Sequence, residues 1–168
     1  MKILSSSVKQ TLNLGQKLAR HLAGGEIILL SGNLGVGKTV LTKGIAQGLG
    51  IDKNEVVSPT FIILRLYPGR LLLQHFDFYR IKQPQEIINL SYHEYLYSDG
   101  VSVIEWPQRL KFLLPKEYLE IKLALTGEHT RRLEFSARGN KYKKLLEKIN
   151  KSRSFLAMKA GKMLTKKK

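Results

Sequence analysis

One stretch of the chain matches a phosphate-binding motif at every fixed position. Residues 32–39 read Gly-Asn-Leu-Gly-Val-Gly-Lys-Thr and fit the pattern G-x-x-x-x-G-K-S/T. Glycines in such a loop let successive backbone N–H groups turn into one concavity, which binds phosphate oxygens. We expect Lys38 to reach the β- and γ-phosphates and the Thr39 hydroxyl to bind Mg²⁺. The motif predicts a nucleoside triphosphate site, contacted by Asn33, Leu34, Gly35, Val36, Gly37, Lys38, Thr39 and Val40.

The residues on both sides of this motif supply the elements that it needs. Residues 27–31 are an apolar run typical of a buried parallel strand. After the loop, Leu41, Ile45 and Leu49 recur at the spacing of one helix face, and Gly50 ends the pattern. A strand, a glycine-rich loop and a helix in this order place the phosphates at the positive end of the helix dipole. A chance match in a glycine-rich turn is the weaker interpretation.

Two acidic residues follow apolar runs and are candidates for the chemistry beyond phosphate binding. Glu105 ends the run 101–105, and Asp77 follows the run 71–76. Ligands of open α/β sheets bind at the carboxyl ends of strands, and Mg²⁺ needs a second protein ligand besides the loop hydroxyl. Glu105 is the expected metal ligand, and Asp77 would order the attacking water or a metal-bound water. The alternatives are a Glu105 that faces water and an Asp77 that caps a helix, and the residues alone do not decide which acid binds metal.

A third catalytic candidate lies in a rigid segment that precedes Asp77 in the chain. Thr60 stands in the sequence Ser58-Pro59-Thr60-Phe61, where Pro59 restricts Ser58 to an extended conformation. A switch threonine at this place would reach Mg²⁺ and the γ-phosphate. An ordinary proline-containing turn is the alternative. His75 is interpreted as a strand residue rather than a ligand.

The composition is that of a small basic protein. Its 168 residues fit a single domain and carry a net charge of +16. Residues 1–137 hold 17 Lys/Arg against 12 Asp/Glu, whereas residues 138–168 hold 12 Lys/Arg and only one acid. The absence of cysteine excludes disulfides and thiolate metal sites. No apolar run reaches the roughly 18 residues of a membrane span and residues 1–7 lack a signal region, so we expect a cytoplasmic protein without a membrane partner.

The remaining periodicity predicts one α/β domain over residues 1–150. Helices are expected at 8–22, 82–89, 92–97 and 142–149, and antiparallel hairpins at 62–76 and 119–137. The second hairpin is expected at the edge of the sheet. With the strands at 27–31 and 101–105, these elements predict a mainly parallel central sheet flanked by helices, with antiparallel hairpins at its margins.

Missing motifs narrow the class of nucleotide-binding protein. No N-K-x-D occurs, and no glycine lies three residues after Asp77, which weakens a GTPase interpretation. An arginine-rich lid flanked by helices, as in small-molecule kinases, is not evident. Two alternatives to an ATPase stay open. One is a small P-loop kinase that phosphorylates a metabolite, and the other is a nucleotide-gated RNA-binding module that uses the basic C-terminal residues.

Four segments, in one order and spacing, resemble the TsaE family, also called YjeE. They are residues 32–39, Ser58-Pro59-Thr60-Phe61, His75-Phe76-Asp77-Phe78-Tyr79-Arg80 and Glu105-Trp106-Pro107. The resemblance spans about residues 5–140 and implies a P-loop NTPase three-layer sandwich that binds and hydrolyses ATP with Mg²⁺. It also implies action with the TsaB–TsaD pair, which transfers threonylcarbamoyl from its adenylate to an adenosine of tRNA. The ATP cycle of such a protein would reset that pair between turnovers.

Residue roles follow from the same resemblance. Lys38 and the loop amides would hold phosphates, and Thr39 and Glu105 would coordinate Mg²⁺. Thr60 would belong to a switch-like segment, and Asp77 would be required for hydrolysis. The resemblance also assigns Gln10 and Thr11 to the region near the adenine and brings Arg132 towards the nucleotide. Asn33 replaces an aspartate that is frequent in the family, at a position where the general motif is variable.

Residues 151–168 extend beyond the part that resembles the family. Apolar residues lie among lysines there, which fits a short basic amphipathic helix or, as the favoured interpretation, a flexible solvated tail. The apolar residues are Phe155, Leu156, Met158, Met163 and Leu164. An ordered tail would contact tRNA phosphates. We therefore expect tRNA as a partner, either indirectly through the TsaB–TsaD pair or through this basic tail.

Overall fold

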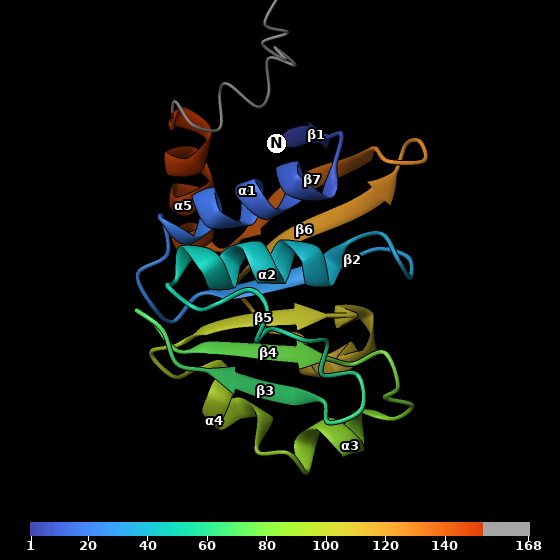
Figure 1. Cartoon of the computed structure of the whole chain (residues 1–168). Helices are drawn as coiled ribbons and strands as arrows, with labels where there is room; N and C mark the ends of the chain where they lie inside the picture. Colours follow the sequence, from blue (N-terminus) through green and yellow to red (C-terminus); the bar gives the residue numbers. More distant parts are fainter. Residues whose placement is uncertain (153–168) are drawn as a thin grey trace, which may run out of the picture.

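The computed structural model describes residues 1–152 and shows a single seven-stranded sheet with helices packed on it (Figure 1). The strands are β1 Lys2–Ser5, β2 Ile27–Ser31, β3 Leu64–Tyr67, β4 Leu73–Asp77, β5 Val101–Glu105, β6 Tyr118–Leu125 and β7 Arg131–Arg138. Their order across the sheet is β1-β7-β6-β2-β5-β4-β3. β6, β2, β5 and β4 are parallel neighbours, and antiparallel strands extend the sheet on both sides. The predicted α/β fold is confirmed.

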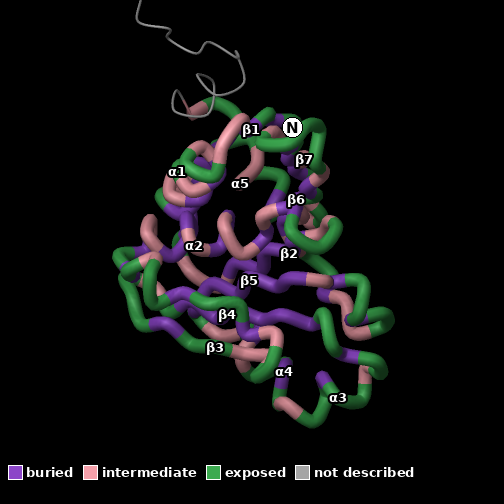
Figure 2. The backbone as a smooth tube through the Cα atoms, turned by 45° about the vertical axis from the view of Figure 1, so that its right-hand side comes forward, coloured by how far each residue is buried: buried purple, intermediate pink, exposed green. Residues whose placement is uncertain are grey.

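The parallel centre of the sheet is the core of the molecule. All five residues of β4 and all five of β5 are buried, as are four of the five in β2. In Figure 2 β4 and β5 run through the middle of the molecule as long buried segments. Parallel strands are covered on both faces, so both sides of these strands are buried, including the polar residues of β4 and β5.

Two helices pack together along one face of the sheet. They are α1 Val8–Ala19 and α2 Lys38–Gly48, which lie in front of the strands in Figure 1. A Cβ on Gly15 would stand 2.5 Å from the carbonyl oxygen of Leu41, and one on Gly44 would collide with the carbonyl oxygen of Leu12. The two backbones therefore touch, and only glycine fits at these two helical positions.

The other helices are α3 Pro84–Ile88, α4 Tyr92–Leu96, α5 Asn140–Lys151 and the 3₁₀ turns η1 Pro107–Arg109 and η2 Lys111–Leu113. Tyr92 of α4 packs edge-on against the rings of Phe76 and Phe78. α5 packs against β7 and β6. Its Tyr142 hydroxyl accepts a hydrogen bond of 2.7 Å from the Ile27 backbone N–H, and burial raises the pKa of Tyr142 to about 12.

The first strand corrects the predicted position of the 119–137 hairpin. β1 pairs with β7 and takes the edge of the sheet, so the hairpin of β6 and β7 lies inside it. β6 pairs in parallel with β2 on its other side. With four residues, β1 is too short for its alternation to stand out in the sequence.

The structure adjusts the ends of several predicted elements. α1 ends at Ala19 instead of residue 22, and β3 begins at Leu64 because Ile63 has a left-handed backbone with φ 70°. The short helices α3 and α4 and the last helix α5 are confirmed. β4 includes Asp77 as its last residue, which matters for the site below. The predicted tail lies, from residue 153 on, outside the described residues.

Candidate nucleotide-binding site

The glycine-rich loop joins the carboxyl end of β2 to the first turn of α2. Gly37, the N-cap of α2, has φ 104°, and Gly32 has φ 143° with the carbonyl of Leu123 where a Cβ would stand. Gly35 has φ 75°, and no atom lies within 4 Å of the position that a Cβ would take there. The glycines thus allow both the turn itself and an open approach to the loop backbone.

The loop lysine is buried at the centre of this turn. Lys38 is 4% exposed, and its ammonium group donates hydrogen bonds of 2.9 Å each to the carbonyl oxygens of Gly32 and Asn33. It also lies 4.0 Å from the centre of the Trp106 ring. Burial lowers the pKa of Lys38, whereas the negative charges of Glu105 and Asp77 raise it. A phosphate group would supply the anionic partner that this cation lacks in the loop.

The two predicted acids meet beside the loop. Asp77 and Glu105 end neighbouring parallel strands and are direct register partners. Both are buried, at 3% and 2% exposure. The Thr39 hydroxyl donates a hydrogen bond of 3.2 Å to Glu105 Oε2. The residues expected to coordinate Mg²⁺, Thr39 and Glu105, are therefore in contact.

His75 is a site residue that the sequence interpretation missed. Its Nε2 lies 2.9 Å from Glu105 Oε1, and neither side chain is appreciably exposed. Among the described residues, His75 Nδ1 is buried without a hydrogen-bond partner. A carboxylate oxygen only accepts, so the Nε2–H group donates this hydrogen bond to Glu105 Oε1. The two oxygens of Glu105 thus have separate partners, His75 on one and Thr39 on the other.

Thr60 contacts Asp77 and not Glu105. Ser58 Oγ and Thr60 Oγ1 lie 2.7 Å and 2.5 Å from Asp77 Oδ2. The other oxygen, Oδ1, accepts a hydrogen bond of 2.9 Å from the Tyr79 backbone N–H. Asp77 therefore holds the predicted switch segment against the end of β4. Asp77 makes these contacts because it is the last residue of β4, where its carboxylate faces the segment that precedes β3.

These groups surround one pocket at the carboxyl end of the parallel strands. It has a volume of about 310 Å³, in the lower part of the range of ligand pockets. Its lining includes the loop, the start of α2, both acids, the switch segment and two aromatic rings. The residues are Leu34, Gly35, Gly37, Lys38, Thr39, Val40, Ser58, Thr60, Asp77, Tyr79, Glu105 and Trp106. The side chain of Val36 is instead buried in the core. Its backbone N–H donates a hydrogen bond of 3.4 Å to the carbonyl oxygen of Asn33.

An arginine reaches the loop, but from the position next to the predicted one. Arg131 is 7% exposed, and its guanidinium lies against Gly37. Its Nη1 is 2.6 Å from the position that a Cβ on Gly37 would take. Its Nε is buried without a hydrogen-bond partner among the described residues. Arg132 points to the other face of β7 and forms an ion pair of 2.7 Å with Glu134. Successive strand residues alternate between faces, so only one of the two arginines can face the loop.

The two residues expected near the adenine are engaged in the start of α1. Gln10 Oε1 accepts from the Ser6 backbone N–H at 2.8 Å, and Gln10 N donates to the Ser7 hydroxyl at 3.1 Å. Thr11 is fully buried, with its hydroxyl 2.8 Å from that of Ser5. Neither residue lines the phosphate pocket. Their contact with an adenine stays a prediction.

Comparison with known proteins identifies the family. Residues 5–133 match the family model described as threonylcarbamoyl adenosine biosynthesis protein TsaE. The chain belongs to the TsaE family. It is 38% identical over 144 residues to the tRNA threonylcarbamoyladenosine biosynthesis protein TsaE of Bacillus subtilis, which covers 85% of this chain and 89% of that protein. The protein of the same name from Treponema pallidum is 38% identical over 133 residues, covering 79% and 98%.

A solved structure agrees with the assignment to TsaE. The crystal structure of Bacillus subtilis YdiB matches with a TM-score of 0.76 and 33% identity, covering 89% of this chain and 93% of that one. The P-loop fold of the family is thereby established for this chain, and its role lies in tRNA threonylcarbamoyladenosine biosynthesis. Within residues 1–152, none of the helices has the length and hydropathy required for a bilayer crossing.

The donor groups of this TsaE-family site suit Mg²⁺. One hydroxyl and two carboxylates offer hard oxygen ligands. Residues 1–152 contain no group of three or more acids, histidines or cysteines placed to hold a metal ion by themselves. Mg²⁺ commonly takes one or two carboxylates and completes its shell with water and substrate phosphates. Thr39 and Glu105 fit that pattern, and Asp77 stands one strand away.

Proposed function

We propose that this TsaE-family protein binds ATP with Mg²⁺ and hydrolyses it to drive tRNA threonylcarbamoyladenosine synthesis in the cytoplasm. The observation that carries the proposal is the contact between Thr39 and Glu105 beside a phosphate loop with a buried lysine. Such a group of residues has no evident use in packing, because it gathers buried charged side chains around a pocket, an arrangement typical of functional sites. The preference for adenine over guanine rests on the missing N-K-x-D motif.

The residues of the loop have distinct tasks in binding. The loop amides and the start of α2 receive phosphate oxygens, and Lys38 turns from the carbonyls of Gly32 and Asn33 towards the terminal phosphates. Arg131, buried next to Gly37, adds a second cation. Thr39 and Glu105 would hold Mg²⁺, which when bound would neutralise phosphate charge.

Asp77 and Thr60 prepare hydrolysis. Asp77 Oδ2 is in contact with the hydroxyls of Ser58 and Thr60, so the switch segment and the acid form one unit. If the nucleotide draws Thr60 towards the γ-phosphate, that carboxylate oxygen loses one of its two hydroxyl partners and would accept a hydrogen bond from the attacking water instead. His75 keeps Glu105 in place throughout, because its Nε2–H binds the oxygen that Thr39 does not use.

The ATP cycle acts on the TsaB–TsaD pair, and this protein does not itself transfer threonylcarbamoyl. The loop 58–63 is the element whose position would report the nucleotide state, because it rests on the acid that faces the pocket. tRNA is then a partner through the pair or through the basic residues beyond 152. Slow hydrolysis by the isolated chain is expected, since partners often complete such sites.

Phosphate release from ATP tests this function. The full chain is assayed alone and with the TsaB–TsaD pair, next to Lys38→Ala and a control, Lys43→Ala, on the same helix. We expect stimulation by the pair and a loss of roughly 100-fold or more in Lys38→Ala, the scale of losing a group that stabilises transition-state charge. Phosphate transfer that requires a small acceptor molecule would instead identify a kinase and contradict the proposal.

A further inference from the structure

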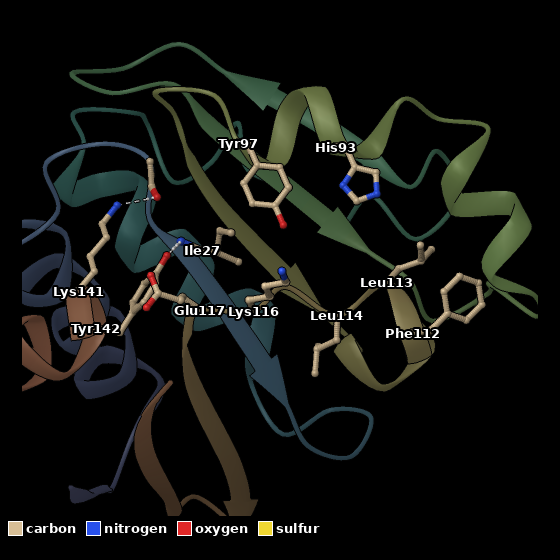
Figure 3. A pocket seen from close by; sticks show the side chains of 11 residues that line it. Ile27, His93, Tyr97, Phe112, Leu113, Leu114, Lys116, Glu117, Lys141 and Tyr142 are labelled. Carbon is tan, nitrogen blue, oxygen red and sulfur yellow. Dashed lines mark hydrogen bonds between the residues drawn. The ribbon is translucent and has the colours of Figure 1, made fainter. Parts of the chain in front are cut away.

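A second large cavity among the described residues lies away from the nucleotide site. It is a groove of about 760 Å³ between α4 and η2 on one side and the start of α5 on the other, with Ile27 of β2 at its base (Figure 3). We call it the amino-edge groove, because Ile27 is the first residue of β2 whereas the phosphate loop follows its last. Its lining residues are Gly25, Ile27, His93, Tyr97, Phe112, Leu113, Leu114, Lys116, Glu117, Lys141 and Tyr142.

Large apolar side chains in this groove face solvent. Phe112 is 74% exposed and Tyr97 is 64% exposed, and the two stand on opposite sides of Leu113 and Leu114 in Figure 3. Both leucines are only partly buried against the core. Exposed aromatic residues that rim an apolar hollow are typical of a binding surface and not of a free face.

The charges at the rim are positive. Lys116 is exposed, and the ammonium group of Lys141 is 2.8 Å from the carbonyl oxygen of Gly25. The single lining acid, Glu117, accepts a hydrogen bond of 3.2 Å from the Asn140 N–H at the start of α5, which leaves its negative charge in place. With two lysines against one carboxylate, the lining carries a net positive charge.

The lysines continue along α5 away from the groove. Lys141, Lys144 and Lys148 are all exposed and three or four residues apart, so they share one side of the helix. The helix has 12 residues and is therefore about 18 Å long. A bound chain that leaves the groove in this direction would meet further positive charge.

Charge and surface chemistry select among the candidate occupants. The chain's own residues 153–168 hold six Lys/Arg and no acid, so they and the same segment of a second copy are repelled by the rim. RNA suits the charge, but Ile27, Leu113 and Leu114 form an aliphatic base without the donors and acceptors that bind nucleobase edges. We propose that the amino-edge groove binds an acidic segment of a protein partner, anchored by an aromatic or aliphatic side chain between Phe112 and Tyr97.

Such a partner leaves the nucleotide site accessible. The five residues of β2 separate Ile27 from the phosphate loop, a distance of roughly 15 Å. None of the residues that line the groove lines the nucleotide pocket. The inference is therefore independent of the proposed ATPase, and a protein without ATPase activity would still bind the segment.

Selection from a random phage-displayed peptide library on the immobilised full chain tests the proposal. We expect the selected peptides to share Asp or Glu flanking an aromatic or aliphatic residue. Their affinity, measured by fluorescence anisotropy, should fall about tenfold or more in Phe112→Ser, since a Phe ring loses its buried contact. Lys116→Glu should weaken binding several-fold, and the difference should shrink in high salt.

Matched variants on another surface control for general effects. Leu4→Ser and Lys9→Glu remove an exposed apolar group and a lysine from β1 and α1, and should bind like the native chain. Unchanged unfolding temperatures show that Phe112→Ser and Lys116→Glu are folded. The proposal is overturned if no peptides are enriched, or if those enriched bind both groove variants normally. It is likewise overturned if labelled oligouridine, rather than peptide, binds and is lost in these variants.

Discussion

Replacing His75 by leucine removes the donor that holds one oxygen of Glu105. The Nε2···Oε1 distance is 2.9 Å and both groups are buried, so no water replaces the imidazole. A hydrogen bond to a charged group contributes about 1.5–3 kcal/mol, which corresponds to a factor of about 10–150 in an equilibrium constant. We expect the Mg²⁺ concentration for half-maximal phosphate release to rise by that order, within the range of about 10–100-fold known for residues that orient metal ligands.

The assay separates positioning from general destabilisation. His75→Gln keeps an N–H donor near the position of Nε2 and should recover most of the native Mg²⁺ dependence. Affinity for ATP in the presence of EDTA should be similar in the native chain and in both variants, because Glu105 contributes through the metal. Equal Mg²⁺ dependence in all three proteins would refute the reasoning, as would an equal loss of metal-free ATP binding in both variants.

Three further predictions follow from the contacts of the site and of the helices behind it. Asp77→Asn should reduce phosphate release by roughly 100-fold or more with ATP affinity nearly kept, and equilibrium binding beside single-turnover rates distinguishes the two effects. Arg131→Ala should weaken ATP binding about tenfold and Arg132→Ala less than twofold, as measured by titration calorimetry. A larger loss in Arg132→Ala would instead identify Arg132 as the arginine that contacts the nucleotide. Gly44→Ala should lower the free energy of unfolding by about 1–3 kcal/mol in urea, because its Cβ meets the carbonyl of Leu12.

The parts of this fold that follow local rules could be predicted from the sequence. The strand before the loop, the loop and α2 occupy consecutive residues, and each has a clear local pattern. Glu105 was also predictable, because an acid that ends an apolar strand lies at the carboxyl edge of a parallel sheet. Which of the two acids contacts the loop hydroxyl was not, since the Thr39–Glu105 contact joins residues far apart in the chain.

The remaining features depend on register and on packing between distant residues. Arg131 and Arg132 differ by one position, and only the pairing of β7 with β6 and β1 determines which one faces the loop. His75 looks like any strand residue until β4 is aligned with β5. The amino-edge groove arises where α4, η2 and α5 meet, and no local pattern in the sequence marks that meeting.

The most direct test of the central claim is the Mg²⁺ dependence of phosphate release from ATP in the native chain with its TsaB–TsaD pair, compared with Glu105→Gln. The amide keeps the shape of the side chain and removes the charge that would hold the metal. The account predicts release that requires Mg²⁺ in the native protein and is reduced by roughly 100-fold or more in the variant. Native-like release from Glu105→Gln at the same Mg²⁺ concentrations would contradict it.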